Sequence, residues 1–184
     1  DMGYQALFNA WQITYDPKDN RTACEQAQSQ GLRCNEGKGD LETIRRINKP
    51  VLLRFTDTQG KDYYMTLTSL HGDKIAYTMN SEPKSGNVDE IVQRWSGDYE
   101  LLWRLPQEYQ DTLKPGGSGP FVMWLDRQLA VLEGKKPRPK SQSTYDKEMV
   151  KKVKTFQSSS GLNPDGIVGP TTIGHLIMKT GSVG

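Results

Sequence analysis

The hydrophobic pattern is clearest in the middle of the first half of the chain, where apolar and polar residues alternate with the period of a β-strand. Three such runs predict strands at Val51–Thr56, Tyr63–Leu70 and Lys74–Met79. Residues 57–60 and 71–73 separate the runs and contain the Gly and Asp residues that turns favour. Because connections this short join antiparallel neighbours, the sequence predicts an antiparallel meander.

Amphipathic segments on both sides of this meander predict short helices. One helix is expected over residues 23–30, a second over Leu41–Ile47 with Asp40 as its N-cap, and a third over Val88–Trp95. A last strand is expected over Tyr99–Leu105. Because helices surround a run of consecutive strands, the first half is predicted to be an α+β domain.

The second half of the chain repeats its apolar residues at helical spacing. A first helix is predicted to begin at Pro120, with one apolar stripe formed by Val122, Leu125, Leu129 and Leu132. A second helix is predicted to follow the N-cap Asp146, and a third to run from Pro170 to near Gly181. Three short helices in this half predict a small bundle.

The charge distribution divides the chain in the same way. Residues 1–108 contain 13 Lys and Arg against 16 Asp and Glu, whereas residues 109–184 contain 11 against 6. We therefore expect two domains, 1–108 and 109–184, with different surfaces. The basic half fits either a solvated surface or an anionic ligand, and it carries no nucleic-acid-binding motif. No apolar run has membrane-spanning length, and since the chain opens at Asp1 we expect it to be a piece of a longer protein.

The chain has only two cysteines, Cys24 and Cys34, and their spacing alone leaves several roles open. They are compatible with two buried thiols, half of a metal site, a redox pair or a disulfide. A zinc site needs about four ligands, and the chain offers only two histidines, one in each half. A continuous helix would hold the cysteines about 15 Å apart, but Gly31 can end the helix and turn the chain back. We therefore favour a disulfide, which implies an oxidising compartment.

The second half resembles the small peptidoglycan-binding domain that many bacterial cell-wall hydrolases carry. The matching positions are Gly117, Gly119, Val122, Leu125, Leu129, Val153, Phe156, Gln157, Gly161, Leu162, Asp165, Gly166, Gly169, Pro170 and Thr172. Asp126 departs from the pattern, since the family commonly has Gln there. Most matching positions are apolar residues or turn glycines, so we expect them to set the fold without touching a sugar.

The resemblance implies a binding groove, which we expect beside the loop Asp165–Thr172. N–H groups at the start of the third helix favour a carboxylate, such as that of a peptide stem. Tyr145 is expected to offer a flat surface to a sugar or stem, although Gln157 and Asp165 are equally suited to holding the loop itself. The candidate peptidoglycan-binding residues are Arg127, Gln128, Tyr145, Gln157, Asp165, Gly169 and Thr172.

The first half resembles the bacteriocin-processing cysteine peptidases, which have a papain-like fold, through TACEQA, PVLLRF, DYYMTL and RWSGDYELLWRLP. Cys24 lies where that family keeps its nucleophile. Tyr63 or Tyr64 lies where the family has its histidine base, and Asn80 lies near the place of its aspartate. The resemblance therefore implies a degenerate papain-like domain without catalytic residues, and we expect neither a cofactor nor a metal.

Together, the two domains resemble the periplasmic region of type II secretion assembly proteins of the GspA/ExeA family. The resemblance implies a non-catalytic region that binds peptidoglycan in the periplasm and helps the secretin pass through the cell wall. It implies the secretin or its assembly partner as further partners, and no nucleic acid. It also implies a membrane anchor and an ATPase upstream of this chain.

Two other hypotheses remain open from the sequence. The chain could be an active cysteine peptidase or cell-wall amidase that uses Cys24, with His71 or His175 as the base that remains. It could also be a purely structural spacer. A nucleophile held in a disulfide cannot attack, so the state of Cys24 distinguishes the enzyme from the binding module.

Overall fold

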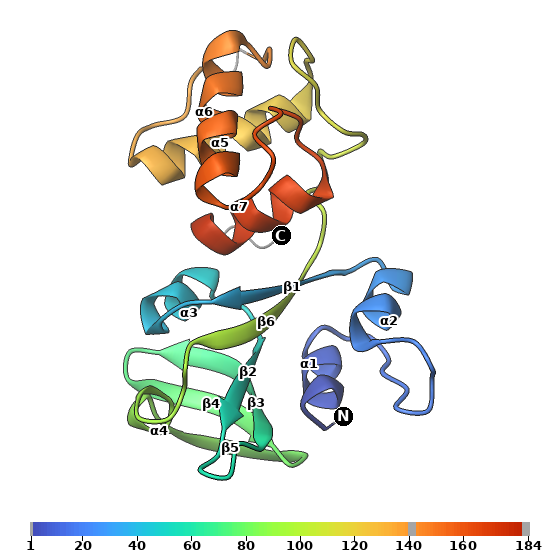
Figure 1. The fold of residues 1–184 in the computed structure, drawn as a ribbon, viewed down its shortest axis with the longest axis vertical. Helices are drawn as coiled ribbons and strands as arrows, with labels where there is room; N and C mark the ends of the chain where they lie inside the picture. Colours follow the sequence, from blue (N-terminus) through green and yellow to red (C-terminus); the bar gives the residue numbers. More distant parts are fainter. Residues whose placement is uncertain (1, 140–142, 182–184) are drawn as a thin grey trace. The chain divides into compact units, whose positions relative to one another are not determined.

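The computed structural model of the protein describes residues 2–139 and 143–181. The chain divides into two compact units, residues 1–104 and 105–184, and this division falls a few residues before the expected one after residue 108. The first unit is α+β and the second is helical, so the predicted fold class is confirmed (Figure 1). Within the described residues, no helix combines the length and the apolar character that a membrane span requires.

The first unit is built on one antiparallel sheet with the strand order β1-β6-β2-β3-β4-β5. Its elements are α1 (Met2–Ala10), α2 (Ala23–Ser29), β1 (Arg33–Lys38), α3 (Leu41–Ile47), β2 (Val51–Thr56), β3 (Asp62–His71), β4 (Lys74–Met79), β5 (Glu82–Asn87), α4 (Asp89–Val92) and β6 (Asp98–Trp103). The predicted meander is present as β2, β3 and β4. The last strand, β6, lies between β1 and β2, so the C-terminal strand of the unit is an inner strand of its sheet.

Three elements of this unit have no counterpart in the sequence-based prediction: α1, β1 and β5. Strands β1 and β5 are the two edges of the sheet, and each has only one neighbouring strand. Their sequences, RCNEGK and EPKSGN, lack the alternation of apolar residues that identifies a half-buried strand. Pairing with β6 and with β4 is therefore what makes these segments extended. Helix α4 is also shorter than the helix expected over Val88–Trp95.

Helices α1 and α2 share a hydrophobic core with the sheet. Leu7 and Phe8 of α1, Ala27 of α2, and Leu52 of β2 are all buried in one cluster. Figure 1 shows α1 beside the strands β2 and β3, which it contacts. This packing fixes the position of α2 relative to the sheet, and α2 carries the first cysteine.

The segment that joins α2 to β1 reverses the direction of the chain. At the start of α2, the Thr22 side chain accepts a hydrogen bond from the Glu25 backbone N–H, and the Glu25 carboxylate accepts one from the Thr22 N–H. At its end, Gly31 has a φ of +79°, the left-handed conformation that glycine adopts most easily. The helix therefore stops and β1 runs back toward its start, as predicted from Gly31.

The described residues of the second unit form three helices that begin where the sequence predicts. They are α5 (Pro120–Glu133), α6 (Lys147–Ser159) and α7 (Pro170–Thr180). Asp146 caps α6 by accepting a hydrogen bond from the Met149 N–H at 2.9 Å, and Gly181 ends α7 with a φ of +73°. Leu132 is 39 % exposed, so the buried stripe of α5 ends at Leu129 rather than continuing to the last predicted position.

Candidate functional site

A disulfide occupies the position at which the cysteine peptidases that the first half resembles have their nucleophile. Cys24 lies in the first turn of α2 and Cys34 in β1, and their Cα atoms are 5.4 Å apart. The predicted bond is therefore confirmed, together with its cause, the chain reversal at Gly31. Because the two sulfurs are bonded to each other, Cys24 has no thiolate that could attack a peptide or an amide in this state.

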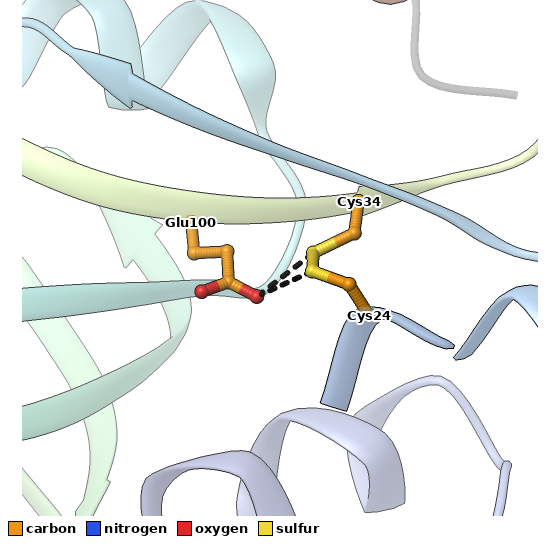
Figure 2. Close-up of side chains that lie close together, drawn as sticks. All are labelled: Cys24, Cys34 and Glu100. Carbon is orange, nitrogen blue, oxygen red and sulfur yellow. Dashed lines mark hydrogen bonds between the residues drawn. A yellow bond between two sulfur atoms is a disulfide. The ribbon is translucent and has the colours of Figure 1, made fainter. Parts of the chain in front are cut away.

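Glu100 forms the other side of this site and was missed by the sequence analysis. It lies in β6 and is 8 % exposed. Its Oε1 lies 2.8 Å from Cys34 Sγ and 3.4 Å from Cys24 Sγ (Figure 2). Its Oε2 accepts a hydrogen bond from the Tyr4 hydroxyl at 2.8 Å. The signal in the sequence was a charged residue between Tyr99 and Leu101, at a position of the last strand whose neighbours are apolar.

Burial makes the charged form of Glu100 unfavourable. Desolvation raises the pKa of its carboxyl group above the usual 4.5, although the hydrogen bond from Tyr4 acts in the opposite direction. A disulfide sulfur has no hydrogen to donate, so the sulfurs of Cys24 and Cys34 cannot compensate a negative charge on Oε1. A neutral carboxyl group, which can donate from Oε1, fits these surroundings better.

A hollow of about 280 Å³ lies beside Glu100. Tyr64, one of the two residues at the expected position of the histidine base, lines it together with Tyr4. Tyr63, the other residue at that position, lines a different hollow, where its ring stacks on Phe55 with the centroids 5.1 Å apart. Among the described residues around the hollow beside Glu100 there is no histidine, so no imidazole is placed there to take up a proton.

The remaining candidates for a catalytic constellation lie elsewhere. His71 is exposed at the end of β3, opposite Lys74 in β4. Asn80, near the expected place of the aspartate, forms the turn between β4 and β5 with a φ of +52°. His175 belongs to α7 of the second unit, where burial lowers the pKa of its imidazole. The structure brings none of them to the hollow beside Glu100.

In the second unit, one buried side chain organises the loop that precedes α7. Gln157 of α6 is 2 % exposed, and its Oε1 accepts a hydrogen bond from the Gly166 N–H at 2.9 Å. Its Nε2 donates to the Ile167 carbonyl at 2.9 Å, to Asp165 Oδ1 at 3.1 Å and to Thr172 Oγ1 at 3.2 Å. Gln157 therefore satisfies the loop backbone, which is the structural interpretation that its sequence position also allowed.

Tyr145 also holds this loop, through a hydrogen bond to its backbone. Its side chain is fully buried, and its hydroxyl donates a hydrogen bond to the Gly166 carbonyl at 2.6 Å. Desolvation raises the pKa of this phenol. The expectation that Tyr145 offers a flat surface to a ligand is therefore wrong, because the ring is buried inside the unit. Thr172, which is 5 % exposed, is likewise an internal residue, while Asp165 is exposed and Gly169 forms the N-cap of α7.

Arg127 and Gln128, the two candidates on α5, have separate partners. Arg127 is half exposed and its guanidinium donates to Glu108 Oε1 at 3.0 Å. Gln128 is 4 % exposed, and its Oε1 accepts a hydrogen bond from Thr180 Oγ1 of α7 at 2.8 Å. Gln128 therefore links two helices in the interior, and of this pair only Arg127 presents a charge to solvent.

Asp126, the departure from the family pattern, has a role in this fold. Its carboxylate accepts hydrogen bonds from the Arg138 backbone N–H at 2.6 Å and from Arg138 Nε at 2.9 Å. The same guanidinium donates to Asp146, the N-cap of α6, at 2.5 Å. Asp126 therefore fastens the segment that leaves α5 to the start of α6.

A larger hollow, of about 570 Å³, lies on the second unit away from the predicted residues. It is lined by the C-terminal ends of α5 and α7 and by one side of α6 along its whole length. Its lining is mainly apolar, with Leu129, Leu132 and Phe156 among its residues, and lysines such as Lys151 stand beside them. None of the candidate peptidoglycan-binding residues lines this hollow.

Comparison with known proteins supports the resemblance seen in the sequence. Residues 118–176 match the family described as "Putative peptidoglycan binding domain". The chain is 31 % identical, over 98 % of its length, to the general secretion pathway protein A of Aeromonas hydrophila, and it spans 32 % of that relative. The resemblance to the GspA/ExeA family is therefore confirmed for this region.

One solved structure shares the fold of this chain. A periplasmic domain of the EpsAB fusion protein of the Vibrio vulnificus type II secretion system is similar with a TM-score of 0.55 and 22 % identity, over 99 % of this chain and 78 % of that one. The N-terminal peptidase C39 like domain of a toxin secretion ATP-binding protein from Vibrio parahaemolyticus shares 19 % identity over 55 % of this chain and 82 % of its own length, with a TM-score of 0.37.

Proposed function

We propose that this chain is the non-catalytic, peptidoglycan-binding region of a type II secretion assembly protein and that it acts in the periplasm. The observation that carries the proposal is the match of residues 118–176 to a peptidoglycan-binding family, within a helical unit that folds around the matching residues. The similarity to a general secretion pathway protein over 98 % of the chain supports the pathway. The disulfide between Cys24 and Cys34 fits the oxidising periplasm.

In this proposal the first unit has no catalytic activity. Cys24 is held in a disulfide, and the hollow beside it is lined by Tyr64 where a peptidase of the resembling family has its base. A cysteine without a base has little thiolate at neutral pH even when it is reduced. We assign this unit a role in contacting other parts of the secretion machinery, such as the secretin or its assembly partner.

We assign the wall contact to the surface at the start of α7. Gly169 provides no side-chain cap, so the N–H groups of the first turn remain available to an anion, and the helix dipole favours one. Gln157 and Tyr145 hold the preceding loop from inside, which keeps this surface in one conformation. The carboxylates of peptide stems are anions, and residues 109–184 carry 11 Lys and Arg against 6 Asp and Glu.

Binding of this kind explains how the chain would help secretion. A protein fixed to the peptidoglycan mesh on one side and to the secretion machinery on the other can position the secretin for its passage through the wall. The resemblance to the GspA/ExeA family also implies a membrane anchor and an ATPase for the full protein, and the chain spans 32 % of its Aeromonas relative.

Co-sedimentation of the full chain with purified peptidoglycan sacculi at low salt tests the binding function. Thr171→Glu introduces a carboxylate at the exposed second position of α7, where the helix dipole tolerates it but a stem carboxylate would be repelled. Thr155→Glu is the matched control, because it introduces the same charge on exposed α6 beside the larger hollow. We expect the wild-type chain and Thr155→Glu to pellet, and most of Thr171→Glu to stay in the supernatant.

Three outcomes would contradict parts of this proposal. If the folded wild-type chain stays in the supernatant, the binding function is wrong. If Thr155→Glu loses binding while Thr171→Glu keeps it, the wall binds in the larger hollow instead of at α7. Peptidase activity that appears after mild reduction and vanishes in Cys24→Ala would show that the first unit is an enzyme.

A further inference from the structure

Three side chains that can bind metal converge at the disulfide. The Sγ atoms of Cys24 and Cys34 and a carboxylate oxygen of Glu100 all lie within 4.8 Å of one another. They come from three different elements, α2, β1 and β6 (Figure 2). Apart from the bond, β1 pairs with β6 in the sheet, and Ala27 of α2 is buried in the core. In the disulfide form, Oε1 of Glu100 faces two sulfurs that have no hydrogen to donate, so a buried polar atom lacks the partner that such atoms normally have.

We propose that the reduced form of this site binds one Zn²⁺ ion through the thiolates of Cys24 and Cys34 and through Oε1 of Glu100, with water as the fourth ligand. A phosphine or dithiol reductant supplies two electrons that break the S–S bond. With a phosphine, phosphorus takes up oxygen from water and the two sulfurs take up the two protons. Both thiols and the carboxyl group of Glu100 then release their protons to solvent as Zn²⁺ binds.

The geometry suits a tetrahedral zinc site. Zn–S bonds of about 2.3 Å and Zn–O bonds of about 2.0 Å place neighbouring sulfur and oxygen ligands about 3.5 Å apart and two sulfurs about 3.8 Å apart. Oε1 of Glu100 already lies 3.4 Å from Cys24 Sγ. Reduction removes the constraint that keeps the two sulfurs in bonding contact, so rotation of the Cys34 side chain can open the remaining distances.

Tyr4 completes the arrangement from the second coordination shell. Its hydroxyl donates to Oε2 of Glu100 at 2.8 Å, which leaves Oε1 directed at the cysteines. Hydrogen bonds of this kind orient metal-binding carboxylates and raise metal affinity. Two thiolates select a thiophilic metal such as zinc, whereas Mg²⁺ and Ca²⁺ prefer sites made only of oxygen ligands.

The two states of the site would connect the same elements in different ways. In the oxidised chain the disulfide joins α2 to β1, and in the reduced chain zinc joins α2, β1 and β6 through one ion. A disulfide sulfur is a poor ligand because it is not a thiolate, so we expect no zinc binding before reduction. This inference does not depend on peptidoglycan binding, and either one can fail without the other.

The test is a zinc titration of the full chain, reduced with tris(2-carboxyethyl)phosphine under nitrogen, against a chromophoric competing chelator. We expect one zinc ion per reduced chain and none per oxidised chain. Co²⁺ in place of Zn²⁺ should give the thiolate charge-transfer bands and the visible bands of a tetrahedral site. Circular dichroism of each sample shows whether the reduced protein is folded.

Substitutions show whether Glu100 coordinates zinc directly or only attracts the cation through its negative charge. Glu100→Gln keeps the shape of the side chain and should weaken zinc binding more than about tenfold, the size of loss that removal of a second-shell partner alone can cause. Glu36→Gln is the matched control, because Glu36 is exposed and lies directly opposite Glu100 in β1. The double variant Cys24→Ser/Cys34→Ser should bind no zinc under any redox condition.

Three results would overturn the inference. A folded, reduced chain that binds no more zinc than the double serine variant would exclude the site. Equal weakening by Glu100→Gln and Glu36→Gln would show that charge, and not ligation, accounts for the role of Glu100. Octahedral Co²⁺ spectra without thiolate bands would show that the metal binds elsewhere on the protein.

Discussion

Replacement of Gln157 by Met removes the centre of the loop network in the second unit while keeping a side chain of similar size. The buried Gly166 N–H then has no acceptor, which costs about 1–3 kcal/mol. The bonds to the Ile167 carbonyl and to Asp165 are lost as well, and each contributes about 0.5–1.5 kcal/mol. Because the Ile167 carbonyl keeps a long bond from Thr172, we expect the free energy of unfolding to fall by about 2–4 kcal/mol in total.

Hydrogen exchange measured by mass spectrometry is the suitable assay for this variant. The chain has two units, so a single melting curve mixes two transitions and does not give one free energy. Backbone amides of α7 report the opening of the second unit alone. Ser158→Ala, at the exposed neighbouring position of α6, is the matched control and should change exchange by less than about 0.5 kcal/mol.

The comparison with this control decides whether the network stabilises the unit. If Gln157→Met exchanges as slowly as Ser158→Ala, the network does not stabilise the unit and the loop is held by other contacts. If exchange accelerates in residues 163–169 but not in α7, the loop opens independently of the helices. The second result would also remove the reason for placing the wall contact on a rigid surface.

Three further predictions concern the disulfide site and the support of the loop. The double variant Cys24→Ser/Cys34→Ser should lower the free energy of unfolding of the first unit by about 2.8 kcal/mol, measured by hydrogen exchange of its sheet amides, and unchanged exchange would contradict the proposed constraint. Glu100→Gln should remove a pH dependence. Because burial raises the pKa of Glu100, the fold loses stability as the pH rises from about 4.5 to that raised pKa and keeps a constant cost above it, so the exchange free energies of sheet amides in wild type and variant should diverge over this range and then stay apart. Tyr145→Phe leaves the Gly166 carbonyl without its 2.6 Å donor and should cost about 1 kcal/mol in exchange of α7 amides, whereas no change would mean that water replaces the hydroxyl.

The helices of the second unit were predictable because their signals are local. Pro120 and Pro170 stand at the first helical positions, Asp146 accepts from a backbone N–H three residues later, and Gly181 adopts a left-handed conformation after α7. Each signal involves residues within one turn of the helix end, so it can be read without knowledge of the fold. The same holds for Gly31, which predicted both the end of α2 and the meeting of the two cysteines.

The edge strands and Glu100 were not predictable from local pattern. Strand β5 has the sequence EPKSGN, and only its ladder with β4 makes it extended. Glu100 meets the cysteines because β6 pairs with β1, which is more than 60 residues earlier in the sequence. Tyr145 was misassigned for a similar reason: its backbone pairs with Gly116 and Gly117, and this pairing draws the ring into the interior.

The position of β6 has a mechanical consequence for a chain anchored at two places. β6 is the last strand of the first unit, and the second unit begins at Leu105, two residues after β6 ends at Trp103. Tension on the second unit therefore reaches the sheet first at β6, which is paired with β1 on one side and β2 on the other. Two ladders of hydrogen bonds hold this strand, whereas an edge strand is held by only one. The connection between the units thus leaves the sheet at a strand that is well placed to withstand pulling.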